Sequence, residues 1–226
     1  MDAKTENSIR QEQLESFGRL MAGFSHDMKN HLGIIRESNG LMDDIIAMGG
    51  CGEDETSVER LRKSISAIER RVGIAANMFH HLSGFAHRPD TPYSSFQLND
   101  LLTEECVFLE RFSRLRQIDV TLEHEKGLAA IYNDPALLQH VVYRLYLLSL
   151  DQLKSGHSLI IITGQNEKNA EIIFRLVGAS QVSLEQLPAN HLLPAINKLE
   201  GILKIGEVTE DHTDLTLTIP SLPLAE

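Results

Sequence analysis

The chain has 226 residues, of which 42% are hydrophobic and 23% charged, a composition typical of a globular protein with one or two domains. Its 32 acidic and 21 basic residues give a formal net charge of -11, which argues against nucleic-acid binding because phosphate recognition needs a basic face. Aromatic residues make up only 5% of the chain and tryptophan is absent, so a surface for base stacking is not expected either.

The N-terminal residues are polar, and no apolar run approaches the roughly 20 residues needed to cross a bilayer. The two cysteines, Cys51 and Cys106, do not form a C-x-x-C pair, and reduced thiols in such a chain are typical of the cytosol. We therefore expect a cytoplasmic protein with no signal peptide and no membrane partner.

Residues 8–87 contain no proline, and their apolar residues repeat at heptad spacing. The first repeat comprises Leu14, Phe17, Met21, Phe24, Met28, Ile35, Met42 and Ile45. The second comprises Val58, Leu61, Ile65, Ile68, Val72, Ala75, Phe79, Leu82 and Ala86. Glycines at positions 49, 50 and 52 predict a turn between them. The pattern predicts two long amphipathic helices that form an antiparallel hairpin.

One hairpin buries little apolar surface, whereas two hairpins pack into a four-helix bundle with a closed core. We therefore expect residues 1–88 to form a homodimer through such a bundle. The alternative is that the hairpin packs on the second half of the chain in a monomer. Heptads that continue through both helices favour the dimer.

A linker is expected over residues 89–95, where Pro89 and Pro92 end the helix and stiffen the connection. In residues 96–226, segments with helical spacing of apolar residues alternate with strand-like segments, which predicts an α+β layer sandwich. Asp134 is the expected N-cap of a buried helix that begins at Pro135. The expected helices cover 98–116, 135–153 and 192–199, and the expected strands cover 118–122, 158–163, 171–177, 202–208 and 214–219.

The polar residues of greatest chemical interest on the first helix surround His26. With Met21 and Phe24 on the apolar seam, His26 lies on the outward face, and Asp27 and Asn30 are within one turn of it. A carboxylate that orients an exposed imidazole makes it a possible nucleophile, although an outward histidine on a helix is usually only a solvated side chain. The neighbours suited to docking another protein are Ala22, Gly23, Lys29 and Gly33.

The segment 18–35, GRLMAGFSHDMKNHLGII, resembles the phosphoacceptor box of sensor histidine kinases, particularly the nitrogen-regulation type, with the approximate pattern G-x-L-x-A-G-x-x-H-E-[IL]-x-N-P-L. The resemblance implies that His26 carries a phosphoryl group, that Asp27 replaces the usual Glu as acid/base partner, and that Asn30 supports hydrolysis of a partner's aspartyl phosphate. His31 replaces the usual proline, so we expect less kinking there and a partly buried ring that needs a hydrogen-bond partner.

Residues 96–226 resemble the ATP-binding domain of the same kinases, a Bergerat-type (GHKL-like) α/β sandwich. The matching segments are 96–102, 131–138, 199–205 and 215–220. The family's nucleotide ligands are missing, because Arg144 and Leu148 occupy its two asparagine positions and Gly178 follows the strand without the aspartate of D-x-G-x-G. No glycine lies between Ser180 and His191, where the family has its glycine-rich lid. We therefore expect a degenerate domain that binds no nucleotide cofactor and no metal.

This combination resembles the dimeric histidine phosphotransferases of phosphorelays. The expected activity is enzymatic transfer of a phosphoryl group between receiver-domain aspartates through His26, without ATP and with Mg²⁺ supplied by the receiver. Response regulator receiver domains are the expected partners, and an upstream histidine kinase is a further candidate. Two alternatives remain: a non-catalytic pseudokinase regulator that binds a kinase or receiver, and an atypical sensor histidine kinase that uses the ATP domain of another chain.

Overall fold

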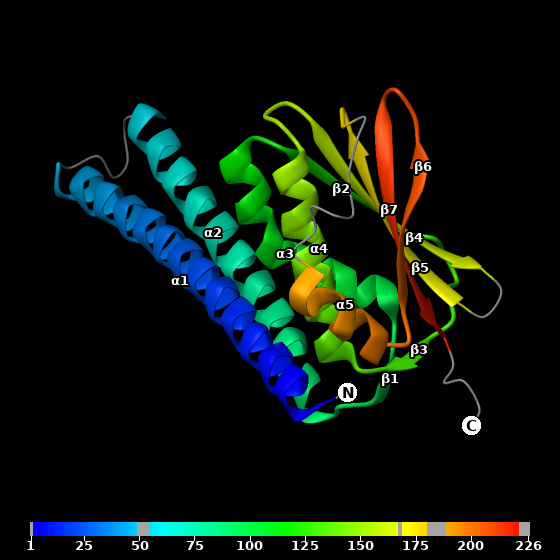
Figure 1. Ribbon diagram of the computed structural model, residues 1–226. Helices are drawn as coiled ribbons and strands as arrows, with labels where there is room; N and C mark the ends of the chain where they lie inside the picture. Colours follow the sequence, from blue (N-terminus) through cyan, green and yellow to red (C-terminus); the bar gives the residue numbers. More distant parts are fainter. Residues whose placement is uncertain (1, 49–54, 167–168, 180–188, 222–226) are drawn as a thin grey trace. The chain divides into compact units, whose positions relative to one another are not determined.

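The computed structural model describes residues 2–48, 55–166, 169–179 and 189–221 (Figure 1). The chain divides into two compact units, one made of residues 1–20 and 84–226 and the other of residues 21–83. Helix α1 covers Ala3–Ala47 and helix α2 covers Glu55–His87, so each helix contributes a stretch to both units. None of the described helices combines the length and hydrophobicity required of a membrane span.

The unit of residues 21–83 is an antiparallel helical hairpin. The rings of Phe24 and Phe79 pack edge to face with centroids 5.3 Å apart, and Nδ1 of His31 lies 3.4 Å from Nη1 of Arg71. Because the partner's residue number falls as the number along α1 rises, the two helices run in opposite directions, as the heptads predict. The glycine turn predicted at residues 49–52 lies outside the described residues.

The apolar seam of this hairpin is only partly covered within one chain. Met28 and Ile45 of α1 are buried. Ile65, Val72 and Phe79 of α2 lie seven residues apart and remain 44%, 51% and 55% exposed. Exposed apolar side chains at heptad spacing form a surface suited to contact with another helix.

The other unit contains a five-stranded sheet with strand order β2-β4-β5-β7-β6. Its strands are β2 Asp119–Glu123, β4 Ser158–Asn166, β5 Asn169–Val177, β6 Ile202–Val208 and β7 His212–Pro220. Strand β2 pairs parallel to β4, and the other neighbours are antiparallel. A small second sheet pairs β1 (Ser94–Phe96) with β3 (Ile131–Asn133).

Helices α3 (Leu98–Arg116), α4 (Pro135–Gln152) and α5 (Ala189–Lys198) lie on one face of the larger sheet (Figure 1). Alternate residues of β4 and β5 are buried, including Leu159, Ile161, Ile172 and Phe174, because their side chains point to the helices. Most residues of α4 are also buried, as its apolar composition predicts. The core of this unit therefore lies between the sheet and the three helices.

The elements largely confirm the predicted α+β architecture, and the predicted bounds of α3 and β6 are those observed. Asp134 caps α4 by accepting a hydrogen bond from the Leu137 amide at 2.9 Å, with Pro135 at the first helical position. Strand β4 extends to Asn166, three residues beyond the predicted end, and the short β1–β3 pair was not predicted. The connection after α2 contains a 3-10 turn at Arg88–Asp90. Cys106 is a free thiol, whereas Cys51 lies outside the described residues.

Candidate functional site

His26 lies in the middle of α1 and its side chain is 54% exposed. Its Nδ1 is 3.3 Å from Oδ1 of Asp27 and 3.2 Å from Nδ2 of Asn30. The contact with Asn30 follows from helical geometry, because residues four apart lie on the same face. The structure thus brings together the three residues that the sequence predicts to form the site.

These contacts determine which ring nitrogen suits nucleophilic attack. When Nδ1 carries the proton, it donates to the Asp27 carboxylate and the ring lone pair is on Nε2. Turning the Asn30 amide by 180° directs its oxygen to the same proton, so both neighbours are compatible with this tautomer. Asp27 is 19% exposed at its side chain and is therefore better shielded from solvent than the ring that it contacts.

The residues predicted to dock a partner lie within two helical turns of His26. Ala22 and Lys29 are exposed, whereas Gly23 and Gly33 are partly exposed. A Cβ placed on Gly33 would have no described atom within 4 Å, so the surface here has room for an approaching loop. Lys29 contributes a positive charge to this surface and is suited to contact with an acidic partner.

His31 is partly buried and finds its partner on the other helix. Its Nδ1 lies 3.4 Å from Nη1 of Arg71, which supplies the hydrogen-bond partner that the sequence analysis required for this ring. Because Arg71 has no acceptor atom, the guanidinium donates and Nδ1 of His31 accepts. His31 therefore links α1 to α2 five residues beyond His26.

The second predicted site, the degenerate nucleotide-binding face of α4, is covered by the first turns of α1. Arg144 donates to Oε2 of Glu12, and Leu148 is 8% exposed. Both residues line a small cavity of about 290 Å³ together with Glu15, Arg19 and Asp151. The two positions that the sequence analysis matched to the family's asparagines thus carry an ion pair with α1 and a nearly buried leucine.

Sequence reasoning did not single out Glu12 or Ser16, which join α1 to α4. Ser16 Oγ donates to the Glu12 carbonyl oxygen at 2.8 Å and lies 3.1 Å from Nδ1 of His140. Burial, and then the charge of Arg144, lower the pKa of His140 to about 4. At this pKa His140 is neutral, and its ring contacts Ser16 through Nδ1 and lies 3.8 Å from Oε2 of Glu12 through Nε2. No local pattern indicates these contacts, because Ser16 and His140 are 124 residues apart.

The backbone conformation explains why a glycine occupies position 178, where the sequence analysis found no D-x-G-x-G motif. Its φ is +94°, in the region that favours glycine, and a Cβ there would lie 2.8 Å from the ring of His157. Its amide donates to the carbonyl oxygen of Asp211 at 2.7 Å. The segment 180–188, where a lid is predicted to be absent, lies outside the described residues.

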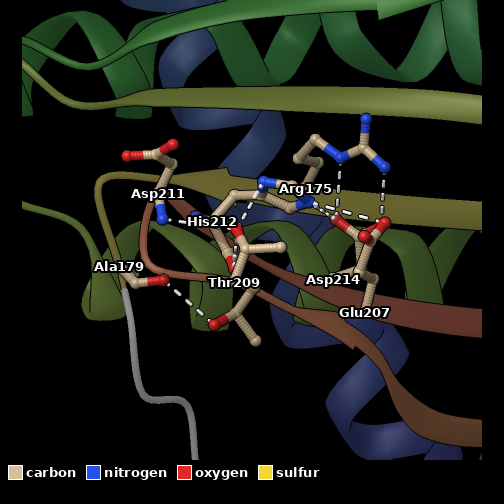
Figure 2. Close-up of polar contacts among 8 residues, drawn as sticks. Arg175, Ala179, Glu207, Thr209, Asp211, His212 and Asp214 are labelled. Carbon is tan, nitrogen blue, oxygen red and sulfur yellow. Dashed lines mark hydrogen bonds and ion pairs between the residues drawn. The ribbon is translucent and has the colours of Figure 1, made fainter.

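A cluster of possible metal ligands that the sequence analysis did not predict lies on β6 and β7 (Figure 2). Ligand atoms of Glu207, His212 and Asp214 lie within 4.8 Å of one another. Asp214 also accepts hydrogen bonds from Nε and Nη2 of Arg175, both at 2.9 Å. The Arg175 guanidinium neutralises Asp214, the most buried carboxylate of the cluster, and this ion pair joins β5 to β7.

No family model and no curated protein matches this chain significantly. Among solved structures, two nucleotide-free forms of the catalytic domain of histidine kinase ThkA align with TM-scores of 0.50 and 0.51, at 14% and 15% identity. Each alignment covers 59% of this chain, and 98% and 100% of the respective ThkA domain. Full-length ShkA in complex with AMPPNP aligns with a TM-score of 0.51 at 8% identity, over 89% of this chain and 47% of ShkA. At these identities the likeness establishes the fold, which is that of histidine kinase catalytic domains.

Proposed function

We propose that the protein is a histidine phosphotransferase of a two-component phosphorelay, which moves a phosphoryl group between receiver-domain aspartates through His26 without ATP. The observation that carries this proposal is the cluster of His26, Asp27 and Asn30 on an exposed face of α1. The histidine-kinase fold of the chain supports a role in two-component signalling. Response regulator receiver domains are the partners that such chemistry requires.

In the proposed reaction, Nε2 of His26 attacks the phosphorus of a receiver's aspartyl phosphate in line with the leaving oxygen. The new N–P bond forms as the P–O bond to the aspartate breaks, and the aspartate leaves as a carboxylate with the bonding electron pair. Asp27 holds the proton on Nδ1 and stabilises the positive charge that the ring gains. Transfer to a second receiver reverses these steps. Such transfer depends mainly on alignment and charge neutralisation, and the receiver supplies its own Mg²⁺.

The α4 face supports a reaction without ATP. A triphosphate with Mg²⁺ needs oxygen or amide ligands for the cation and donors for the phosphates. At the corresponding positions Arg144 is paired with Glu12, and Leu148 has no atom that can coordinate a cation. Three carboxylates, of Glu12, Glu15 and Asp151, and two guanidinium groups, of Arg19 and Arg144, line the small cavity at this face, so it has no excess of positive charge for a triphosphate.

A homodimer is part of the proposal. Ile65, Val72 and Phe79 leave a row of exposed apolar side chains at heptad spacing on α2, and Leu32 on α1 is 62% exposed. Pairing with a second hairpin covers such a row in a four-helix bundle. Light scattering on the purified chain should give twice the monomer mass of 25.3 kDa.

The proposal is tested by supplying phosphate from two sources. A panel of receiver domains, each phosphorylated with labelled acetyl phosphate and freed of the donor, is mixed with the chain, and labelled MgATP is used separately. We expect acid-labile label from at least one receiver and none from ATP. The His26→Gln variant should lose the label, whereas His80→Gln, which alters another exposed histidine, should keep it.

Each other outcome favours one of the alternatives. Label transferred from ATP would identify an atypical kinase, and label from neither source would favour a pseudokinase that only binds its partners. Retention of label by His26→Gln would exclude this histidine as the acceptor. Circular dichroism of both variants controls for folding.

A further inference from the structure

The unit of residues 1–20 and 84–226 contains a cavity of about 550 Å³ that the proposed phosphotransfer does not use. Its walls are mainly apolar and come from the first turns of α1, the end of α2 and helices α3 and α4. They include Ile9, Phe17, Leu20, Phe85 and Tyr143. Phe17 stacks on Phe85 with ring centroids 5.6 Å apart, which gives part of the wall a flat aromatic surface. A cavity of this size falls in the range that holds small organic ligands.

Two side chains on this wall, Glu105 and Tyr143, have buried polar atoms without a hydrogen-bond partner among the described residues, and Glu105 is the more completely buried of the two. Glu105 of α3 lines the cavity and is 0% exposed, yet neither of its carboxyl oxygens has a hydrogen-bond partner in the described parts of the chain. The neighbouring guanidinium of Arg88 instead donates to Glu104 and to Gln139. A buried carboxyl group without partners is costly, so its hydrogen bonds should be satisfied by a molecule inside the cavity.

The charge of the cavity indicates what kind of molecule this is. Burial raises the pKa of Glu105 well above its ordinary value, so the group is a neutral carboxylic acid that donates one hydrogen bond. His140, also on the wall, is neutral because burial lowers its pKa to about 4. The remaining charged residues are Glu6, Arg10, Asp134 and Lys198, two acidic and two basic. Their charges cancel, and Glu6 is already paired with both Arg10 and Lys198.

We propose that this cavity binds an uncharged, largely apolar small molecule whose carbonyl group or similar acceptor takes a hydrogen bond from Glu105. The apolar walls contribute most of the affinity, and the buried carboxyl group fixes the orientation of the ligand. A charged ligand would lose its hydration without meeting a compensating charge. This proposal does not depend on the proposed phosphotransfer.

Nile red, an uncharged apolar dye with one ring carbonyl, serves as the probe. Titration into the full chain should raise its fluorescence and saturate at one dye per chain. Glu105→Met keeps the bulk of the side chain but removes the donor, and it should weaken dye binding about tenfold, the effect of one hydrogen bond. Ala136→Leu adds bulk to the cavity wall and should abolish saturable binding. Glu110→Met, an exposed position on the same helix, should bind as the wild type does.

Three results would overturn the proposal. The first is the absence of saturable binding by the wild type, which would leave water as the occupant. The second is equal affinity of Glu105→Met and wild type while the Ala136→Leu variant loses binding, since the carboxyl group would then not face the ligand. The third is a stoichiometry of one dye per two chains, which would place the dye between copies. Glu105→Met should melt at or above the wild-type temperature because it removes a buried polar group, so a loss of affinity cannot be attributed to unfolding.

Discussion

Replacing Glu105 with glutamine should change the dependence of stability on pH. Glu105 is buried, and desolvation raises its pKa well above the value of 4.5 that is usual for glutamate, against the opposing charge of Arg88 and with a further contribution from Glu104. The unfolded chain releases this proton above about pH 4.5, whereas the folded chain keeps it. The carboxyl group therefore favours folding at low pH, and this contribution is lost as the pH rises.

The magnitude follows from proton linkage. While the folded chain holds one proton more than the unfolded chain, the free energy of unfolding falls by about 1.4 kcal/mol for each pH unit, until the pH reaches the folded-state pKa. His140 acts in the opposite direction, because burial lowers its pKa from 6.5 to about 4. Its contribution is present above pH 6.5 and is lost as the pH falls to about 4. The two contributions cancel between about pH 4.5 and 6.5, and above that range only the effect of Glu105 remains.

Urea unfolding, followed by circular dichroism in half-unit steps from about pH 5 to about pH 8, measures this effect. The stability of Glu105→Gln relative to wild type should rise by about 1.4 kcal/mol for each pH unit, because glutamine has no proton to lose. The free energy of unfolding of the His140→Gln variant, relative to that of wild type, should rise by a similar amount for each pH unit below pH 6.5. Glu110→Gln, altered at an exposed position of α3, is the control and should follow wild type at every pH.

Parallel curves for Glu105→Gln and wild type would refute this reasoning. They would mean that the carboxyl group has the same protonation in the folded and unfolded chains, and hence that solvent or an ionic partner reaches it. A trend of the opposite sign would mean that the folded chain stabilises the carboxylate.

Three further predictions concern other residues. Asp134→Ala should lower the free energy of unfolding by about 1 kcal/mol because α4 loses its N-cap. Asp134→Asn, which can still cap the helix, should keep most of the wild-type stability, and urea titrations of both variants measure the difference. Asp27→Asn should slow phosphoryl transfer to His26 by about tenfold, which is less than the roughly 10²- to 10⁴-fold typical of an acid/base partner because the site is exposed. An unchanged labelling rate would contradict the role of Asp27. Arg175→Ala should lower the free energy of unfolding by about 1 to 3 kcal/mol because it leaves the buried Asp214 carboxylate unpaired. Thermal unfolding measures this effect, and equal melting temperatures of variant and wild type would contradict it.

Elements with strong local signals were predicted from the sequence with little error. Asp134 and Pro135 specify the start of α4 because the cap and the fixed φ act within one turn. Helix α3 ends at Arg116, as predicted, and Gln117 after it adopts a left-handed conformation. His26 and Asn30 belong to the same class, because residues four apart on a helix lie on one face whatever the rest of the fold does.

Features that depend on distant pairing could not be predicted in this way. Strands β1 and β3 have three residues each and exist only because they pair with each other. The contact of Arg144 with Glu12 joins residues 132 positions apart, and Glu105 carries no sequence sign that its carboxyl group lacks a partner. Periodicity identifies a buried face of a helix, but it does not identify which segment buries that face.

The contact between Ser16 and His140 has a consequence for synthesis of the chain on the ribosome. At typical rates of about 5 to 20 residues per second, the first turns of α1 wait roughly 6 to 25 s before their partners on α4 are made. During this interval Ile9 and Leu20, buried in the finished protein, are exposed to other nascent chains and to chaperones. The N-terminal segment therefore carries apolar surface that is open to aggregation until α4 is made.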